Sequence, residues 1–214
     1  MSQLQIDAIG ISTILENVAS DLKEHCEELG DLDSKIGDGD LGITIGLFCS
    51  AISDYLSSIN EKDIGKLLVQ CGIRINAANP STFGTILASA FIGGGKAVLG
   101  KTNLELYDLV YIGDGAVESI QKRGKAEIGG KTLLDTLVPT VNKFKEEISK
   151  GSDLDKAISI AVSAAQEGMK STINMKAKYG RAACFQDNSI GIQDAGATAF
   201  YYLIESFAKY LNSK

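Results

Sequence analysis

The chain has 214 residues, of which 44% are hydrophobic and 22% charged, and its formal net charge is −6. This length and apolar share predict one well-packed domain over residues 1–214 and exclude a disordered chain. The negative charge argues against a nucleic-acid-binding surface and against binding to anionic membranes. No stretch reaches the roughly 18 uninterrupted apolar residues of a membrane span, and the N-terminus lacks the pattern of a secretion signal. We therefore expect a cytoplasmic protein.

The cysteines and the histidine show no spacing typical of a disulfide framework, a metal site or a catalytic triad. Cys26, Cys49, Cys71 and Cys184 are scattered without Cys-x-x-Cys spacing. This usage predicts buried free thiols in a reducing compartment rather than disulfides or a zinc site. His25 is the only histidine, so a histidine-based triad or metal site would depend on it alone. We interpret it as a packed or solvent-facing residue rather than a substrate anchor.

Apolar residues recur at helical spacing from the start of the chain. The stripe over 11–29 predicts a first helix that ends near Gly30. A second helix is expected over about 42–58, with Leu47 among the residues that face inward. A third helix should stop at Pro80, because proline disfavours helical backbone in the residue before it.

Two capping signals follow. Ser81 or Thr82 predicts the start of a fourth helix, because a hydroxyl can accept a hydrogen bond from a free helix N–H. Thr102 has Glu105 three residues on, the spacing of a capping box, and predicts the start of a fifth helix.

Three more helices complete the expected set. Thr132 opens the sixth, in which Pro139 should kink the helix rather than end it. Asp153 caps a seventh that should reach about Lys178, and an eighth follows Asp194. No run of alternating β-branched residues predicts a strand, so the sequence indicates one all-α domain without a sheet.

Three of the connections are richer in glycine, acid and arginine than short turns require: 33–42, 124–131 and 179–196. Short connections suffice between helices of a bundle. Longer polar loops on a rigid scaffold are the usual place for functional residues. A functional site is therefore expected among these three loops.

The first of these loops reads SKIGDGDLG after one more acid, and it holds Asp33, Asp38 and Asp40. An ordinary acidic turn is one interpretation, because Asp-Gly pairs are common in turns. A calcium EF-hand is excluded by spacing: counted from Asp31, the sixth position is Ile36 rather than glycine, and the twelfth is Gly42 rather than glutamate.

A magnesium–phosphate site is the third interpretation. Mg²⁺ prefers a few carboxylates, with water and substrate phosphates completing its coordination. Three aspartates and a nucleoside diphosphate together carry a charge of about −6, which favours two ions over one. Gly37, Gly39 and Gly42 would let phosphate oxygens approach the backbone, and the helix that begins near Gly42 offers free N–H groups to them.

The other loops offer cations and hydroxyls. RGKAEIGGKT, residues 123–132, looks like a phosphate-binding Walker motif, but Lys125 stands where that motif needs glycine and no strand precedes it. The last loop contributes Arg181 and, at a helix start, Asp194. By itself Arg181 is either an ordinary surface residue or a phosphate ligand.

Six blocks in order along the chain resemble the L subunit, or nucleotide-binding domain, of dihydroxyacetone kinases. They lie at 32–42, 83–85, 123–132, 134–139, 171–182 and 189–198. The resemblance implies an antiparallel barrel of eight helices with a nucleotide–magnesium pocket at one end.

The resemblance also implies a set of site residues. The magnesium ligands fall on Asp33, Asp38 and Asp40, and Asp38, Asp40 and Arg181 are the expected catalytic residues. The expected nucleotide contacts are Gly42, Thr44, Asn79, Gly124, Leu133, Arg181, Asp194 and Gly196.

The implied function is phosphoryl transfer with ADP or ATP and two Mg²⁺. Bound ADP would be recharged by a phosphohistidine phosphotransferase (M-type) subunit and would pass the group to a small ketose on a K subunit. In single-chain members ATP is the substrate. Two alternatives stay open: an ATP-dependent kinase for another small ketose or an acyl group, and a nucleotide-sensing protein without transfer activity. No nucleic-acid or membrane partner is expected, and the oligomeric state is left open.

The chain departs from the family pattern at several positions. Leu41 replaces a histidine, Gly130 an aspartate and Ala195 a proline, while Asn79 and Pro80 stand in a loop that is usually glycine-rich. The three aspartates are kept. The resemblance therefore leaves open the phosphoryl donor and the acceptor.

Overall fold

The computed structural model describes residues 4–58 and 60–211, and this part of the chain is almost entirely helical. Its α-helices are α1 (Ala8–Glu24), α2 (Cys26–Asp33), α3 (Leu41–Leu56), α4 (Ile64–Ala78), α5 (Thr82–Ala97), α6 (Leu106–Gly124), α7 (Leu134–Ser149), α8 (Leu154–Ser171) and α9 (Ala195–Leu211). Two 3₁₀ helices, η1 (Thr172–Asn174) and η2 (Arg181–Ser189), lie before α9. In the described residues, no helix is both long and apolar enough to cross a membrane.

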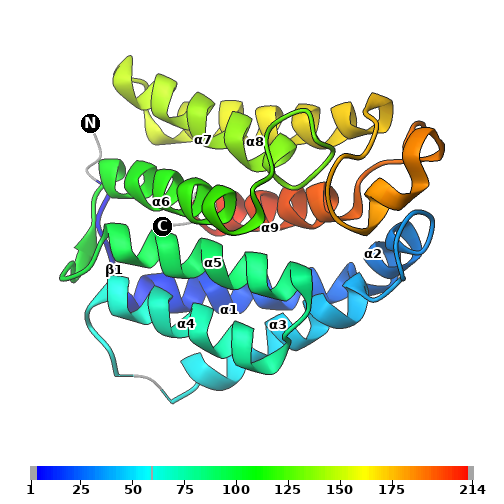
Figure 1. Ribbon diagram of the computed structural model, residues 1–214. Helices are drawn as coiled ribbons and strands as arrows, with labels where there is room; N and C mark the ends of the chain where they lie inside the picture. Colours follow the sequence, from blue (N-terminus) through cyan, green and yellow to red (C-terminus); the bar gives the residue numbers. More distant parts are fainter. Residues whose placement is uncertain (1–3, 59, 212–214) are drawn as a thin grey trace.

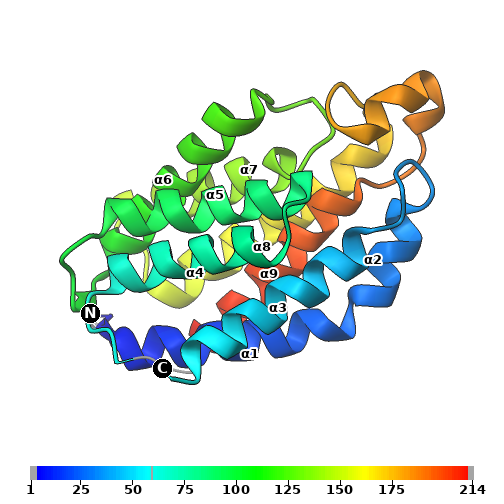
Figure 2. The same cartoon turned by 60° about the horizontal axis from the view of Figure 1, so that its bottom comes forward.

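Eight of the helices form a closed ring. Each of α3, α4, α5, α6, α7, α8 and α9 packs against the next, and α9 returns to α1, which contacts α3. Figures 1 and 2 show these helices side by side around a common interior. Helix α2 lies at one end, where it packs on α3 and α9. The predicted eight-helix barrel is confirmed.

The interior of the ring is apolar. Buried side chains such as Ile14, Ile45 and Ile75 form a continuous core, and removal of this surface from water drives the folding. A cavity of about 250 Å³ lies within the ring and is lined almost wholly by apolar residues of α1 and α4 to α9. Close helix contacts depend on glycine: a Cβ on Gly115 would lie 2.6 Å from the carbonyl oxygen of Gly93, where α5 and α6 cross.

Helix starts are capped largely as the sequence predicts. The Ser81 hydroxyl accepts the N–H of Gly84 at 3.0 Å, and the Asp153 carboxylate accepts the N–H of Lys156 at 2.8 Å. Such caps each stabilise a helix by about 1 kcal/mol. Helix α7 continues through Pro139 instead of ending there, as expected, while the kink stays a prediction.

The prediction of one helix from 11 to 30 is wrong, because the chain breaks at His25 (φ −98°, ψ 1°). The imidazole stacks on the ring of Tyr202 from α9, with centroids 3.8 Å apart. The apolar pattern gives no sign of this break, since Leu22 on α1 and Leu29 on α2 are both buried. The break lets α2 lie against α3 and α9 as a separate helix.

The expected capping box at Thr102 is also wrong. Residues Asn103–Leu104 form strand β2, which pairs antiparallel with β1 (Ile6–Asp7), so the prediction of no sheet fails for this short ladder. Helix α6 starts after Glu105, whose N–H donates to the Asp108 carboxylate at 2.9 Å.

Two further predictions, one on the end of a helix and one on a buried side chain, are wrong. Helix α8 ends at Ser171 rather than near Lys178. Leu47 is 40% exposed rather than inward, because Phe48 and Ile52 form the buried face of α3.

The cysteines are free, as predicted, but not all of them are buried. Cys49 and Cys71 are enclosed, Cys26 is half-buried and Cys184 is exposed.

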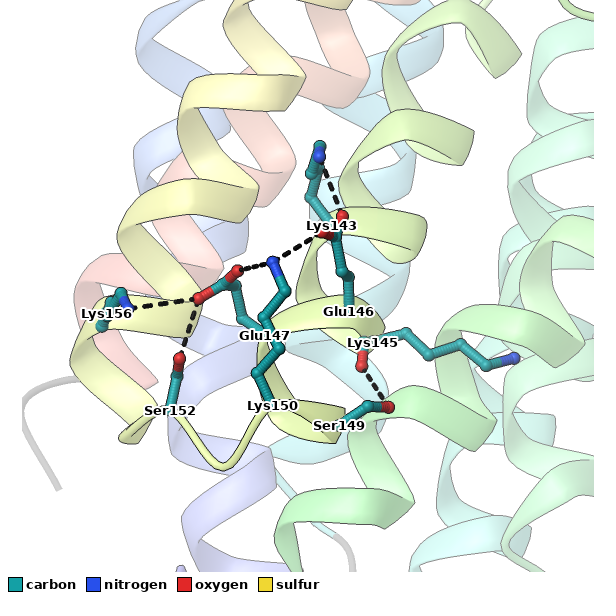
Figure 3. Close-up of polar contacts among 8 residues, drawn as sticks. All are labelled: Lys143, Lys145, Glu146, Glu147, Ser149, Lys150, Ser152 and Lys156. Atoms are coloured by element: carbon teal, nitrogen blue, oxygen red, sulfur yellow. Dashed lines mark hydrogen bonds and ion pairs between the residues drawn. The ribbon is translucent and has the colours of Figure 1, made fainter.

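The turn between α7 and α8 is held by Glu147 (Figure 3). Its nearly buried carboxylate pairs with Lys150 at 2.8 Å and with Lys156 at 3.5 Å, and it accepts the Ser152 hydroxyl at 2.8 Å. These partners stabilise the ionised form, and the hydrogen bond from Lys150 contributes most. They lower the pKa of Glu147 from 4.5 to about 2.

We expect Glu147 to give the fold a pH-dependent share of its stability. Because its pKa is lower when folded, the contribution is full above the unfolded value of 4.5 and is lost as the pH falls towards 2. Urea unfolding should therefore show Glu147→Gln less stable than the parent at pH 7, with the gap narrowing below pH 4.5. Replacement of the exposed Glu167 by Gln is the matched control and should show no such convergence. A constant gap across the range would contradict the assignment.

Candidate functional site

The polar loops meet at one end of the ring, at the right of Figure 1, where the loop after α2 approaches the segment before α9. A cavity of about 350 Å³ lies there. Its polar wall comprises Asp33, Asp38, Asp40, Ser81, Thr82, Lys131, Thr132, Tyr179, Arg181 and Asp194. Its apolar wall includes Ile36, Leu41, Phe83, Ile86, Ile120, Ala126, Leu133 and Leu134.

Three carboxylates converge in this cavity. Asp33 is the last residue of α2, Asp40 directly precedes α3, and Asp38 lies in the loop between them. One oxygen from each lies within 4.8 Å of the others. Oδ2 of Asp33 is buried, and among the described residues it has no hydrogen-bond partner. A buried, unpaired carboxylate oxygen beside two further carboxylates fits a divalent cation.

The glycines of this loop have separate tasks. A Cβ on Gly37 would overlap the Asp33 carboxylate, so any residue larger than glycine would displace that carboxylate. Gly39 has φ +72°, a left-handed conformation that favours glycine. A Cβ on Gly42 would overlap the carbonyl oxygen of Cys26, so this glycine lets α3 pack closely on α2. Gly42 thus serves helix packing and is not part of the cavity wall.

Arg181 lines the same cavity and contacts one of the three carboxylates. Its guanidinium forms an ion pair with Asp38, and the two side chains are 61% and 35% exposed. Exposed ion pairs contribute little to stability, about 0 to 1 kcal/mol. The pair can therefore open at small cost when an anion enters the cavity.

Asp194 closes the cavity at the start of α9. Its carboxylate accepts the N–H of Ala197 at 2.7 Å, and its own N–H donates to the Thr172 hydroxyl at 3.0 Å. Burial raises the pKa of Asp194 to about 6, against the opposing effects of the Ala197 N–H and of Lys131. The carboxylate is thus a helix cap whose negative charge is costly in this place.

The structure divides the predicted nucleotide contacts into two groups. Five of them line the cavity: Gly124, Leu133, Arg181, Asp194 and Gly196. Gly42, Thr44 and Asn79 are not part of its wall.

Thr44 and Asn79 are engaged with each other. Asn79 Nδ2 donates to Thr44 Oγ1 at 2.8 Å, its Oδ1 accepts the Ser81 N–H at 3.0 Å, and Thr44 is only 2% exposed. This network fixes the start of α5, and Ser81 and Thr82 line the cavity there instead.

Sequence reasoning missed several wall residues. The apolar wall residues Phe83, Ile86 and Ile120 come from helical stripes that read as core. Tyr179 lies inside a resembling block but has no distinctive spacing. Lys131 is 1% exposed and has φ +59°, a combination that only the folded structure reveals.

The DAK2 domain family matches residues 35–209, which is most of the chain. The chain belongs to this family. The matched part of the DAK2 domain contains Asp38, Asp40, Arg181 and Asp194, and Asp33 lies just before it. The family expected from the sequence blocks is confirmed.

Two relatives align with this chain over most of their length. The PEP-dependent dihydroxyacetone kinase, ADP-binding subunit DhaL, of Escherichia coli (strain K12) is 32% identical over 182 residues, covering 85% of this chain and 87% of the relative. The PEP-dependent dihydroxyacetone kinase 2, ADP-binding subunit DhaL, of Listeria innocua is 29% identical over 206 residues, covering 95% of both. These relatives are named as kinase subunits, in agreement with the expected phosphotransferase.

Solved structures share the DAK2 fold. The dihydroxyacetone kinase of C. freundii superimposes with TM-scores of 0.73 in its native form and 0.70 in complex with AMP-PNP and Mg²⁺, at 21% and 22% identity. The match covers 93% and 92% of this chain but about a third of that longer chain. At this identity the likeness establishes the fold.

Replacement of Gly37 by alanine should weaken metal binding in this DAK2 domain, because the new Cβ would displace the Asp33 carboxylate. We expect a loss of about tenfold or more in Mg²⁺ affinity by calorimetry, with the helical circular dichroism unchanged. Gly46→Ala is the matched control, since its Cβ would meet only Cys26 Sγ at 4.0 Å. Equal affinities for parent and Gly37→Ala would remove Asp33 from the ligand set.

Proposed function

We propose that this chain is the ADP- or ATP-binding, magnesium-dependent subunit of a dihydroxyacetone kinase-like enzyme, which passes a phosphoryl group to a small ketose held on a partner K subunit. The observation that carries the proposal is the convergence of three carboxylates opposite the guanidinium of Arg181 in one cavity. The names of the relatives, which are ADP-binding subunits of dihydroxyacetone kinases, support the same assignment.

Asp33, Asp38 and Asp40 would hold the metal. The charge of about −6 on three aspartates and a nucleoside diphosphate favours two Mg²⁺ ions. Bound magnesium would neutralise phosphate charge and fix the geometry of the phosphates. The protein contributes three carboxylates in a fixed arrangement. Among the described residues, Oδ2 of Asp33 has no hydrogen-bond partner and could bind the metal.

The rest of the cavity suits an adenine nucleotide. Phe83, Ile86 and Leu133 form an apolar wall for a purine ring. Helix α3 begins at the cavity and has no side-chain cap, so the free N–H groups of its first turn are available to phosphate oxygens. Arg181 would leave Asp38 and contact the transferred phosphoryl group, since its planar fork fits two phosphate oxygens.

The ketose and the phosphoryl donor would come from partners. His25 is the only histidine of the chain, and it is stacked on Tyr202 and is not part of the cavity wall. No histidine of this chain is therefore placed to hold a carbonyl substrate at the site. A K-type subunit would cover the open end of the cavity, and a phosphohistidine (M-type) subunit would recharge bound ADP.

Arg181→Lys should lower turnover by more than tenfold, which corresponds to about 1.4 kcal/mol or more. A lysine keeps the charge but loses the two-pronged contact with phosphate oxygens. Turnover is measured with Mg²⁺, nucleotide and a competent K-type partner. Arg74→Lys, on α4 over the ring of Tyr55, is the control and should behave as the parent. Unchanged turnover in Arg181→Lys would make Arg181 an ordinary surface residue.

The function itself is tested by reconstitution. The chain alone with Mg·ATP and three- and four-carbon ketoses should form no sugar phosphate at a useful rate. Addition of a K-type subunit should give dihydroxyacetone phosphate, either with ATP or with phosphoenolpyruvate and the phosphohistidine subunit. Asp38→Ala is the matched inactive variant. Nucleotide binding without transfer under both donor conditions would favour a nucleotide-sensing protein, and activity of the chain alone would overturn the need for a partner.

A further inference from the structure

Lys131 is a buried cation whose side chain is surrounded by backbone carbonyl groups. Its side chain is 1% exposed, and Nζ donates to the carbonyl oxygens of Thr172 (2.7 Å), Ser189 (2.8 Å), Met175 (3.3 Å) and Ile192. These four acceptors come from a segment more than forty residues along the chain. A lysine so enclosed is rare unless its charge is fully compensated.

The contacts identify the group as an ammonium ion. A neutral amine has two protons and a lone pair, which would repel at least one of four carbonyl oxygens, whereas an ammonium offers three protons. Burial lowers the pKa of Lys131, and the nearby carboxylate of Asp194 opposes this. The backbone of Lys131 is also held at φ +59°, a conformation that is unfavourable for a residue with a side chain and is kept only where the surroundings impose it.

The four carbonyls mark the base of a loop. Two of them lie in 172–175 and two in 189–192, and Nζ holds these two stretches together. The Gly191 N–H donates to the Ile173 carbonyl at 2.7 Å between the same stretches. Arg181 lies on the intervening loop 176–188, which the orange segment of Figure 1 contains. Arg181, which pairs with Asp38, is thus carried by a loop whose two ends the Lys131 ammonium group holds together.

We propose that Lys131 is a positioning residue, whose ammonium group closes the base of the 176–188 loop and so holds Arg181 over the carboxylates. This proposal rests on the proposed function for the role of Arg181 in phosphoryl transfer. The closure of the loop is independent of that function and can be measured without nucleotide.

The first experiment is limited proteolysis of Lys131→Ala. Trypsin sites at Lys176, Lys178 and Arg181 lie in the loop, and we expect their cleavage to become about tenfold faster when the base opens. Lys125→Ala is a matched control, because Lys125 also has positive φ (52°) but is exposed. It should leave the cleavage rate in the loop unchanged.

Chemical rescue separates the charge from simple packing. Alanine keeps Cβ, so the atoms removed correspond to propylammonium, which should restore slow cleavage in Lys131→Ala. Propanol has nearly the same shape without charge, and tetramethylammonium has charge without N–H donors; neither should restore slow cleavage.

If the alanine variant does not fold, Lys131→Met fills the same space without charge and must show the faster cleavage. Unchanged cleavage, or equal rescue by propanol, would overturn the proposal.

A double-mutant cycle tests the link to the site. Lys131→Ala should weaken Mg·ATP binding in the parent but have little further effect once Arg181 is replaced by alanine, because both changes remove the same contact with the phosphoryl group. Additive losses would overturn the action through Arg181. If the parent binds no nucleotide, the proposed function fails, while the proteolysis and rescue results still decide whether Lys131 closes the loop.

Discussion

Mutual repulsion among Asp33, Asp38 and Asp40 is the constraint on which the site end of this protein depends. At a separation of 4.8 Å, the largest among the three oxygens, two unit charges repel by about 3.5 kcal/mol for an effective dielectric constant near 20. The fold holds the carboxylates against this repulsion by fixing Asp33 at the end of α2 and Asp40 at the start of α3. The positive end of the α3 dipole and the guanidinium of Arg181 offset part of the charge. A bound cation would neutralise the negative charge that remains.

The helices themselves were largely predictable, because burial of one face imposes a 3.6-residue period on the sequence. The ring followed from the family resemblance and is consistent with short connections between neighbouring helices. The break at His25 could not be predicted, since Leu22 and Leu29 keep the apolar pattern in phase across it. The strand pair was missed because two residues are too few to show alternation, and its partner at Asn103–Leu104 lies almost a hundred residues away.

The candidate site was predictable to the extent that its chemistry is local. The three aspartates lie within eight residues, and glycine around them is a local signal. Thr44 and Asn79 were expected at the nucleotide from the family resemblance alone, and no pattern in the sequence indicated that they form a hydrogen-bond network with each other and with Ser81 at the start of α5. Gly130 gives a second case: a Cβ there would lie 2.5 Å from the ring of Tyr179, so the loss of the family aspartate leaves room for an aromatic wall residue.

The ammonium of Lys131 differs from the metal site in one respect that follows from its covalent attachment. A ring of carbonyl oxygens around a central charge is the kind of cage that holds a potassium ion in other proteins. A free ion in such a cage exchanges with solvent, and its occupancy follows the ionic composition of the cell. A lysine cannot dissociate, so this cage keeps its cation whatever the monovalent salt concentration, and the carboxylate end of the cavity is the part that would take up a cation from solution.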